Sequence, residues 1–194
     1  LEPRNKKLKT MTPKKLEIRG RFYGLIRRPS IKSKLSTSQL NKLKKEFHEL
    51  TIKYLESSDR QYRKSKGQYF TPKSIREKLL KQLPNHKKNP RILDPACGSG
   101  EFLLSASEYF KDPFLYGWDI EETLIKSANI MVPQANVKVV DSLKHKTKEK
   151  FDFVIGNPPY FEYKPEKLIR QKYQAVINGR PNIFTFFIKL GLDL

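Results

Sequence analysis

Residues 91–119, RILDPACGSGEFLLSASEYFKDPFLYGWD, contain the pattern that indicates the fold class of the chain. RILD (91–94) and FLYGWD (114–119) are short apolar runs typical of buried strands, and EFLLSASEYF (101–110) between them has the pattern of a helix. The alternation continues with a helix at 121–131, strands at 137–141 and 151–157, and a helix at 182–194. Alternating helices and nearly continuous apolar strands predict an α/β fold, a mostly parallel twisted sheet with helices on both faces.

The N-terminal part of the chain differs from this α/β part in charge. Residues 1–66 carry 20 basic and 6 acidic side chains, a net charge of +14. Residues 67–194 carry 20 basic and 14 acidic side chains, a net charge of only +6. We therefore expect two regions, a basic and partly helical extension at 1–61 and an α/β domain at 62–194.

Three segments precede the first strand. Residues 1–35 mix Lys, Arg and Pro without any period, which predicts an arm that is partly ordered at best. Residues 38–58 repeat apolar side chains three and four positions apart, which predicts one amphipathic helix with N-caps available at 36–38. A shorter amphipathic helix is predicted at 73–83, directly behind Pro72.

The bulk composition favours some partners and disfavours others. With 40 Lys and Arg against 20 Asp and Glu, the net charge of +20 indicates a polyanionic partner, most simply nucleic acid, over a merely solvated surface. A single cysteine excludes a disulfide framework, and three scattered histidines predict no metal site. No run approaches the roughly 18 apolar residues of a membrane helix. Because no targeting signal is seen, we expect a reducing, cytoplasmic location without a membrane partner.

The first strand ends in a loop that is suited to a ligand. Ligands of parallel sheets bind beyond the carboxyl ends of the strands, where DPACGSGEF (94–102) begins with Asp94. Gly98 and Gly100 let the backbone turn tightly and approach a ligand closely. The loop has no Walker lysine and does not fit G-x-G-x-x-G, so it is not a standard phosphate loop.

The next two strands also end in acids. Asp119 can accept hydrogen bonds from two ribose hydroxyls, and Ile120 beside it can offer an apolar face to a base. Asp141 can accept a hydrogen bond from an exocyclic amine, and Leu143 can pack on a ring. We interpret the three strand ends as a site for ribose and adenine with a charged tail near Asp94. The alternative for each acid is a helix N-cap or a first-turn charge.

Five short motifs occur in a specific order: GQYFTP (67–72), DPACGSG (94–100), GWDIEE (117–122), VVDSL (139–143) and NPPY (157–160). This series resembles the S-adenosylmethionine-dependent amino-methyltransferases of DNA. GQYFTP is similar to the N-terminal cofactor motif of the adenine-N6 enzymes of restriction–modification systems. The resemblance implies a Rossmann-like methyltransferase domain, S-adenosylmethionine as cofactor, and site-specific methylation of adenine N6 in double-stranded DNA.

The matching positions imply a set of site residues. Those that would contact the cofactor are Gln68, Tyr69, Phe70, Thr71, Pro72, Asp94, Pro95, Ala96, Gly98, Gly100, Asp119, Ile120, Asp141, Ser142, Leu143 and Asn157. Those that would act in catalysis are Asn157, Pro158, Pro159 and Tyr160.

The NPPY turn offers chemistry that methylation of an exocyclic amine needs. The lone pair of such an amine is delocalised into the ring, so acceptors on its two N–H groups are required to localise it. The side-chain oxygen of Asn157 and the rigidly held carbonyl of Pro158 can supply these two acceptors. Tyr160 offers a face on which a base flipped out of the duplex can stack, and we expect Phe161 to belong to the core.

The resemblance also implies parts that this sequence does not contain. The last strands of the sheet, a later aromatic motif and a recognition domain would follow Leu194. We therefore expect either a fragment or an enzyme completed by a recognition domain or second subunit, with 162–181 as the loop nearest the DNA. Other functions stay open: methylation of cytosine N4, of RNA or of a protein glutamine, and a non-catalytic cofactor- or DNA-binding role.

Overall fold

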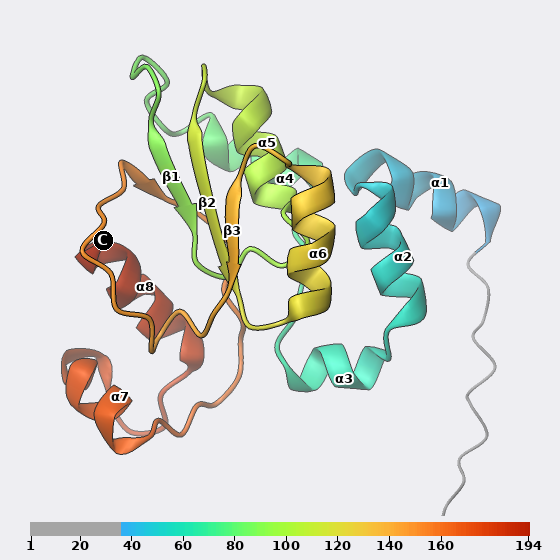
Figure 1. Cartoon of the computed structure of the whole chain (residues 1–194). Helices are drawn as coiled ribbons and strands as arrows, with labels where there is room; N and C mark the ends of the chain where they lie inside the picture. The colour runs from blue at the N-terminus through green and yellow to red at the C-terminus, as the bar shows by residue number, and fades with distance from the viewer. Residues whose placement is uncertain (1–35) are drawn as a thin grey trace, which may run out of the picture. The chain divides into compact units, whose positions relative to one another are not determined.

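The computed structural model describes residues 36–194, which belong to one compact unit, Leu35–Leu194 (Figure 1). The predicted arm at 1–35 lies outside the described residues, and the boundary at 61/62 stays a prediction. No helix among residues 36–194 is long and apolar enough to cross a membrane.

Four parallel strands form the sheet. They are β1 (Arg91–Asp94), β2 (Phe114–Asp119), β3 (Asn136–Val139) and β4 (Phe153–Val154), in the spatial order β3-β2-β1-β4. Leu93 in the centre pairs with Tyr116 of β2 on one side and with Val154 of β4 on the other. The predicted parallel α/β fold is confirmed, and this order places the carboxyl ends of all four strands along one edge.

The last two strands are shorter than the sequence predicts. Pairing of β4 ends at Val154, although the Ile155 N–H still donates to the Leu93 carbonyl at 2.8 Å. Gly156 then adopts a φ of +147° with its Cα against the Asp94 carboxyl group. An added Cβ would lie 3.0 Å from Asp94 Cγ, so only glycine fits there, and the two prolines that follow cannot donate to a ladder.

Helices cover both faces of the sheet, as predicted. Figure 1 shows α4 (Lys73–Leu80), α5 (Glu101–Tyr109) and α6 (Glu122–Met131) on one side and α8 (Ile183–Asp193) on the other. Between the sheet and the first group lies a core of aliphatic and aromatic side chains that includes Ile92, Leu103, Ala106, Leu115 and Val132. A second cluster joins α8 to the segment before it and includes Leu143, Ile169, Tyr173 and Phe186.

The single helix predicted at 38–58 is wrong, because the chain breaks it. α1 (Thr37–Glu46) begins with a capping box between Ser36 and Gln39, and α2 (Glu49–Ser57) begins at His48, followed by α3 (Arg60–Ser65). Phe47 is extended, with φ −137° and ψ 148°. The break lets the His48 N–H donate to Glu101 Oε1 at 2.9 Å, a partner that lies 53 residues away and that no local pattern reveals.

The segment 162–181 is not a plain loop, which corrects a second expectation. It contains α7 (Lys167–Lys172) and a 3₁₀ turn, η1 (Gln174–Val176). Ile169 and Tyr173, four positions apart, are buried against α8 and hold the short helix in place.

Candidate active site

A cavity of about 280 Å³ lies beyond the carboxyl ends of the strands. It is lined by most of the predicted cofactor and catalytic residues, namely Gln68, Tyr69, Phe70, Thr71, Asp94, Pro95, Ala96, Gly98, Asp119, Ile120, Asp141, Ser142, Leu143, Asn157 and Pro159. Residues as far apart in the sequence as Lys66 and Phe187 therefore meet around one space, close to the size of small-molecule sites.

The glycine loop after β1 is folded back on itself and tied to β2. The Asp94 Oδ1 accepts the Ala96 N–H at 3.0 Å, and the Cys97 N–H donates to the Trp118 carbonyl at 2.9 Å. Gly98 has a φ of +53°, and its N–H donates to Asp119 Oδ2 at 2.8 Å. These hydrogen bonds fix the loop backbone in a conformation in which residues 94–98 line the cavity.

Asp94 is the most strongly perturbed acid of the site. Its side chain is buried, with 1% of the residue exposed. Burial raises the pKa of Asp94 to about 8, with a smaller contribution from the charge of Asp119, against the opposing hydrogen bond from Ala96. Burial raises the pKa of Asp119 as well. Two acids whose ionised forms lack solvation favour a cationic group in the cavity.

The ends of β2 and β3 present the other two predicted acids. Asp119 accepts backbone N–H groups from Gly98 and Glu121 at 2.8 and 2.9 Å, and each oxygen keeps a lone pair for a ligand. Asp141 Oδ1 accepts the Leu143 N–H at 3.1 Å, so this acid stabilises a turn and also lines the cavity. The Ser142 hydroxyl donates to the Pro95 carbonyl at 2.6 Å, which ties the third strand end to the glycine loop.

The NPPY turn and the GQYFTP segment lie against each other. The Asn157 Nδ2 donates to the Tyr69 carbonyl at 3.2 Å, although the residues are 88 positions apart. A carbonyl can only accept, so this contact leaves the Asn157 Oδ1 as an unused acceptor. Gly67, with a φ of +61°, packs on the turn so closely that an added Cβ would lie 2.5 Å from the Tyr160 nitrogen.

Four predicted residues lie outside the cavity wall. Pro72 occupies the N-cap position of α4, and Gly100 packs against Ala128 where α5 begins. Pro158 lines a neighbouring cavity of about 330 Å³ instead. Tyr160 is 48% exposed and its ring lies 5.5 Å from that of Phe184.

Several wall residues were missed by the sequence reasoning. Lys66, Glu101, Glu121 and Phe187 line the cavity, and Phe161, expected in the core, lines it while also packing on the second cluster. The sequence did offer a reason to predict Glu101 as a wall residue, because it is a charged residue in an otherwise mostly apolar helix. Glu121 lies within the motif GWDIEE but was not singled out. Lys66 had no signal, because its position depends on how α3 meets α6, where the Tyr62 hydroxyl donates to Glu121 Oε1 at 2.6 Å.

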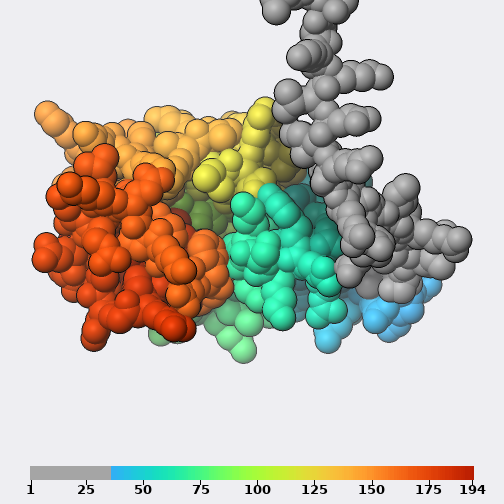
Figure 2. Space-filling view, turned by 90° about the horizontal axis from the view of Figure 1, so that it is seen from below, coloured from blue at the N-terminus to red at the C-terminus, as the bar shows by residue number. Residues whose placement is uncertain are grey.

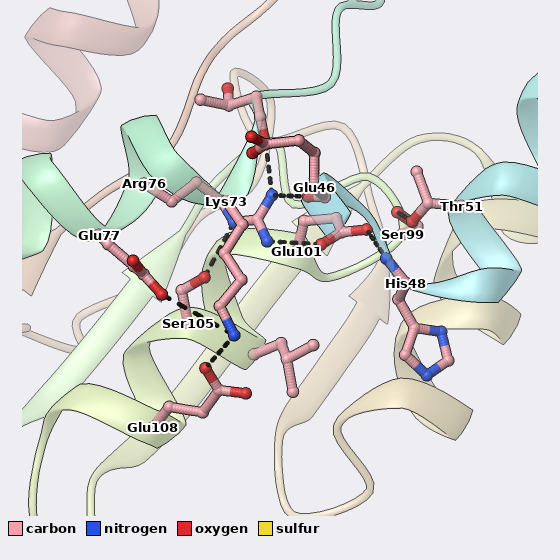
Figure 3. Close-up of polar contacts among 12 residues, drawn as sticks. Glu46, His48, Thr51, Lys73, Arg76, Glu77, Ser99, Glu101, Ser105 and Glu108 are labelled. Carbon is pink, nitrogen blue, oxygen red and sulfur yellow. Dashed lines mark hydrogen bonds and ion pairs between the residues drawn. The ribbon is translucent and has the colours of Figure 1, made fainter. Parts of the chain in front are cut away.

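Behind the cavity lies a buried ionic network, drawn in Figure 3. Arg76 of α4, with 1% exposed, pairs with Glu101 Oε2 at 2.8 Å, and its Nε donates to the Ser105 hydroxyl at 2.9 Å. The same guanidinium donates to the Thr71 carbonyl. Since Glu101 also accepts the His48 N–H, one ion pair fixes the GQYFTP segment, α5 and the α1–α2 break together.

Comparison with known proteins identifies the family of this architecture. Residues 46–188 match the family model for N-6 DNA methylases, which is most of the chain. The chain belongs to the N-6 DNA methylase family. Among curated relatives, it is 31% identical over 117 residues to the type II methyltransferase M.CvrRI of Paramecium bursaria Chlorella virus XZ-6E, covering 59% of this chain and 30% of that protein.

A second curated relative and a solved structure support the same family and fold. The modification methylase CviBIII of Paramecium bursaria Chlorella virus NC1A is 28% identical over 147 residues, 74% of this chain and 38% of that protein. A putative class I S-adenosylmethionine-dependent methyltransferase of Listeria monocytogenes superposes with a TM-score of 0.59 at 24% identity, covering 73% of this chain and 46% of that one. The chain spans about a third of the length of these curated relatives. The fold is thus that of a Rossmann-like methyltransferase.

The described part of the chain has no cluster that could hold a metal. Among residues 36–194, no three or more His, Cys, Asp or Glu side chains are grouped for that purpose. The free Cys97 is buried in the glycine turn, where burial raises the pKa of its thiol.

Proposed function

We propose that this chain is the catalytic part of a DNA methyltransferase of a restriction–modification system, which transfers a methyl group to N6 of a flipped-out adenine. The observation that carries the proposal is the contact between Asn157 and Tyr69. It joins the NPPY turn to the GQYFTP segment in the same cavity as the acids that end β1, β2 and β3.

The residues of the cavity fit S-adenosylmethionine. Ile120, 68% exposed, offers an apolar face to adenine, and Asp119 beside it has lone pairs left for the ribose hydroxyls. Thr71 Oγ1 is buried at the wall and has no hydrogen-bond partner among the described residues. A polar group of the ligand would satisfy this hydroxyl, since buried unpaired groups are costly. Asp94, which lines the cavity at the end of β1, would receive the cationic end.

The cofactor, when bound, would supply an electrophilic methyl group to the amine. The protein's part is to make that amine a better nucleophile. The Asn157 Oδ1 accepts one N–H, and the Pro158 carbonyl, which accepts no hydrogen bond from the described residues, accepts the other. Both acceptors are held by a turn that cannot relax, because two prolines fix it and Gly67 supports it from behind.

Tyr160, the last residue of the NPPY turn, is exposed and offers its ring to the target base. An amine within a stacked duplex cannot reach the cavity, so the base must leave the helix, at a cost of a few kcal/mol. Contacts to the phosphates can offset that cost. The net charge of +20 supports DNA as the substrate.

The relatives support a larger assembly. They include proteins named as type I restriction enzyme methylase subunits of Methanocaldococcus jannaschii, and the region that matches this chain is only 30% of M.CvrRI and 18% and 19% of these two subunits. We propose that a recognition domain or subunit completes the active enzyme. The alternative functions are methylation of cytosine N4, which the same acceptors would serve, and cofactor or DNA binding without catalysis.

The test is product analysis. The chain is incubated with unmethylated DNA and S-adenosylmethionine, and the DNA is digested to nucleosides for mass spectrometry. N6-methyladenine supports the proposal, and N4-methylcytosine would keep the mechanism and change the base. No product, with cofactor binding intact by calorimetry, would favour the non-catalytic alternative for this chain.

A further inference from the structure

A second hollow lies next to the candidate active site. It has a volume of about 490 Å³ and is lined by Glu162, Tyr163, Lys164, Pro165, Arg170, Gly179, Arg180 and Pro181. Two backbone contacts join the two segments that line it. The Tyr163 N–H donates to the Pro181 carbonyl at 2.9 Å, and Glu162 forms an isolated antiparallel β-bridge with Asn182. We call this space the basic hollow, since three of its residues are cations and one is an acid.

The cations of the basic hollow are not neutralised by the described part of the chain. Lys164, Arg170 and Arg180 form no ion pair and no side-chain hydrogen bond with any of residues 36–194. The nearby Lys144, in contrast, pairs with Glu166 at 2.9 Å. The cations of the hollow therefore remain available to an external anion.

The basic hollow and the candidate active site share a wall. Tyr163 lines both spaces, and only two residues separate it from Tyr160 of the NPPY turn. Lys66, which lines the active-site cavity from the side of α3, has its ammonium 5.7 Å from the centre of the Tyr62 ring. Figure 2, seen from below the sheet of Figure 1, shows the segment around 160–180 in orange beside residues around 60–70 in teal.

We propose that the basic hollow binds the phosphodiester backbone of the nucleic acid next to the nucleotide whose base enters the cavity. Arg170 and Arg180 each present a planar fork of donors that matches phosphate oxygens, and Lys164 adds a point charge. This assignment rests on the proposed function, and it names the side chains that would hold the substrate's backbone.

A polynucleotide fits this position better than a small anion or the cofactor. The hollow lies across Tyr163 from the cavity that the three acids line, so a chain of phosphates can lie in the hollow while one base enters the cavity. The carboxyl groups that end β2 and β3, Asp119 and Asp141, line the cavity together with Glu121 and would repel an anion inside it. The two spaces thus differ in charge in the way that a cationic cofactor and a polyanionic substrate require.

The experiment measures how DNA binding depends on salt. Affinity of the whole 194-residue chain for a fluorescent duplex is measured by anisotropy over a salt series, for the wild type and for the double variant Arg170→Gln/Arg180→Gln. Since each phosphate contact adds about one unit to the salt slope, the double variant is expected to lose about two units and to bind more weakly. Both arginines are exposed, so the melting temperature should be unchanged.

Two matched variants and one separate measurement complete the design. Arg170→Lys/Arg180→Lys should keep most of the slope, and Lys88→Gln/Lys111→Gln, at the opposite edge of the sheet before β1 and β2, should keep all of it. Cofactor affinity is measured by calorimetry for each protein. An unchanged slope in the Arg→Gln variant would overturn the assignment and leave the methyltransferase proposal standing. The assignment of the basic hollow would also be overturned if the Arg→Gln variant lost only cofactor binding, or if the wild type bound no duplex. The nucleoside analysis tests the methyltransferase proposal independently.

Discussion

Gly67 has no room for a side chain, and this makes it a sharp test of how the two motifs meet. Gly67→Ala places a Cβ 2.5 Å from the Tyr160 nitrogen at a φ of +61°. Left-handed backbone costs about 1–2 kcal/mol and overpacking about 1–3 kcal/mol, so we expect a loss of about 2–5 kcal/mol in the free energy of unfolding. Chemical denaturation measures it.

Gly179→Ala is the matched control, because Gly179 has a φ of +56° and nothing within 4 Å of its added Cβ. It should show the backbone cost alone, about 1–2 kcal/mol. Equal losses for the two variants would mean that the GQYFTP segment does not pack on the NPPY turn as described.

Asp94 makes stability depend on pH in a predictable direction. Its folded pKa of about 8 lies above its ordinary value of 3.8, so between these values the folded protein holds a proton that the unfolded chain releases. The free energy of unfolding of the wild type should therefore fall, relative to Asp94→Asn, as pH rises toward 8, and level off above it. Denaturation of both proteins over this pH range measures the difference, and a difference that is constant or rises with pH would contradict the burial of Asp94.

At the residue scale, the sequence predicts which residues line the cavity better than which atoms contact one another. The acids at the strand ends were predicted because each follows a recognisable apolar strand. The hydrogen bond from Asn157 to Tyr69 was not predicted, because it joins residues 88 positions apart through a side chain and a carbonyl. Such pairings depend on the whole fold.

At the scale of elements, the pair Arg76–Glu101 joins α4, α5 and the α1–α2 break. Breaking a buried ion pair leaves an uncompensated charge, so Arg76→Met should lower the free energy of unfolding by about 3–5 kcal/mol. The double variant Arg76→Met/Glu101→Leu should lose clearly less than the sum of the two single variants, since the second change removes the stranded charge.

The exposed pair Lys126–Glu122 on α6 is the control for this cycle. Its atoms are 2.8 Å apart, but 70% and 66% of the two side chains are exposed. Lys126→Met should change stability by less than about 1 kcal/mol. Additive losses at Arg76 and Glu101 would show that the network of Figure 3 does not couple these elements.

Helices and strands with strong local patterns were predicted closely, and those that depend on distant partners were not. β1 and β2 have the predicted bounds, because each apolar run ends at an acid, Asp94 or Asp119, where the strand itself ends. The sequence did not predict the break at Phe47 or the helical turns within 162–181. The break depends on the hydrogen bond from His48 to Glu101, and the helical turns depend on packing against α8.

At the scale of the whole molecule, parallel pairing in the order β3-β2-β1-β4 aligns the strand ends so that motifs spread over 90 residues share one cavity. The fold class followed from strand–helix alternation alone. The separation of charge did not follow from the sequence. Acids line the cavity, and cations without an ion-pair partner among residues 36–194 line the adjacent hollow, which only the folded chain reveals.

The measurement that tests the account most directly is the rate of methyl transfer from S-adenosylmethionine to DNA in a single turnover, compared between the wild type and Asn157→Ala. Loss of one preorganised hydrogen-bond partner should lower the rate about 100-fold or more, while calorimetry still detects cofactor binding. Methyl transfer at the wild-type rate in Asn157→Ala would contradict the proposal that this amide activates the amine.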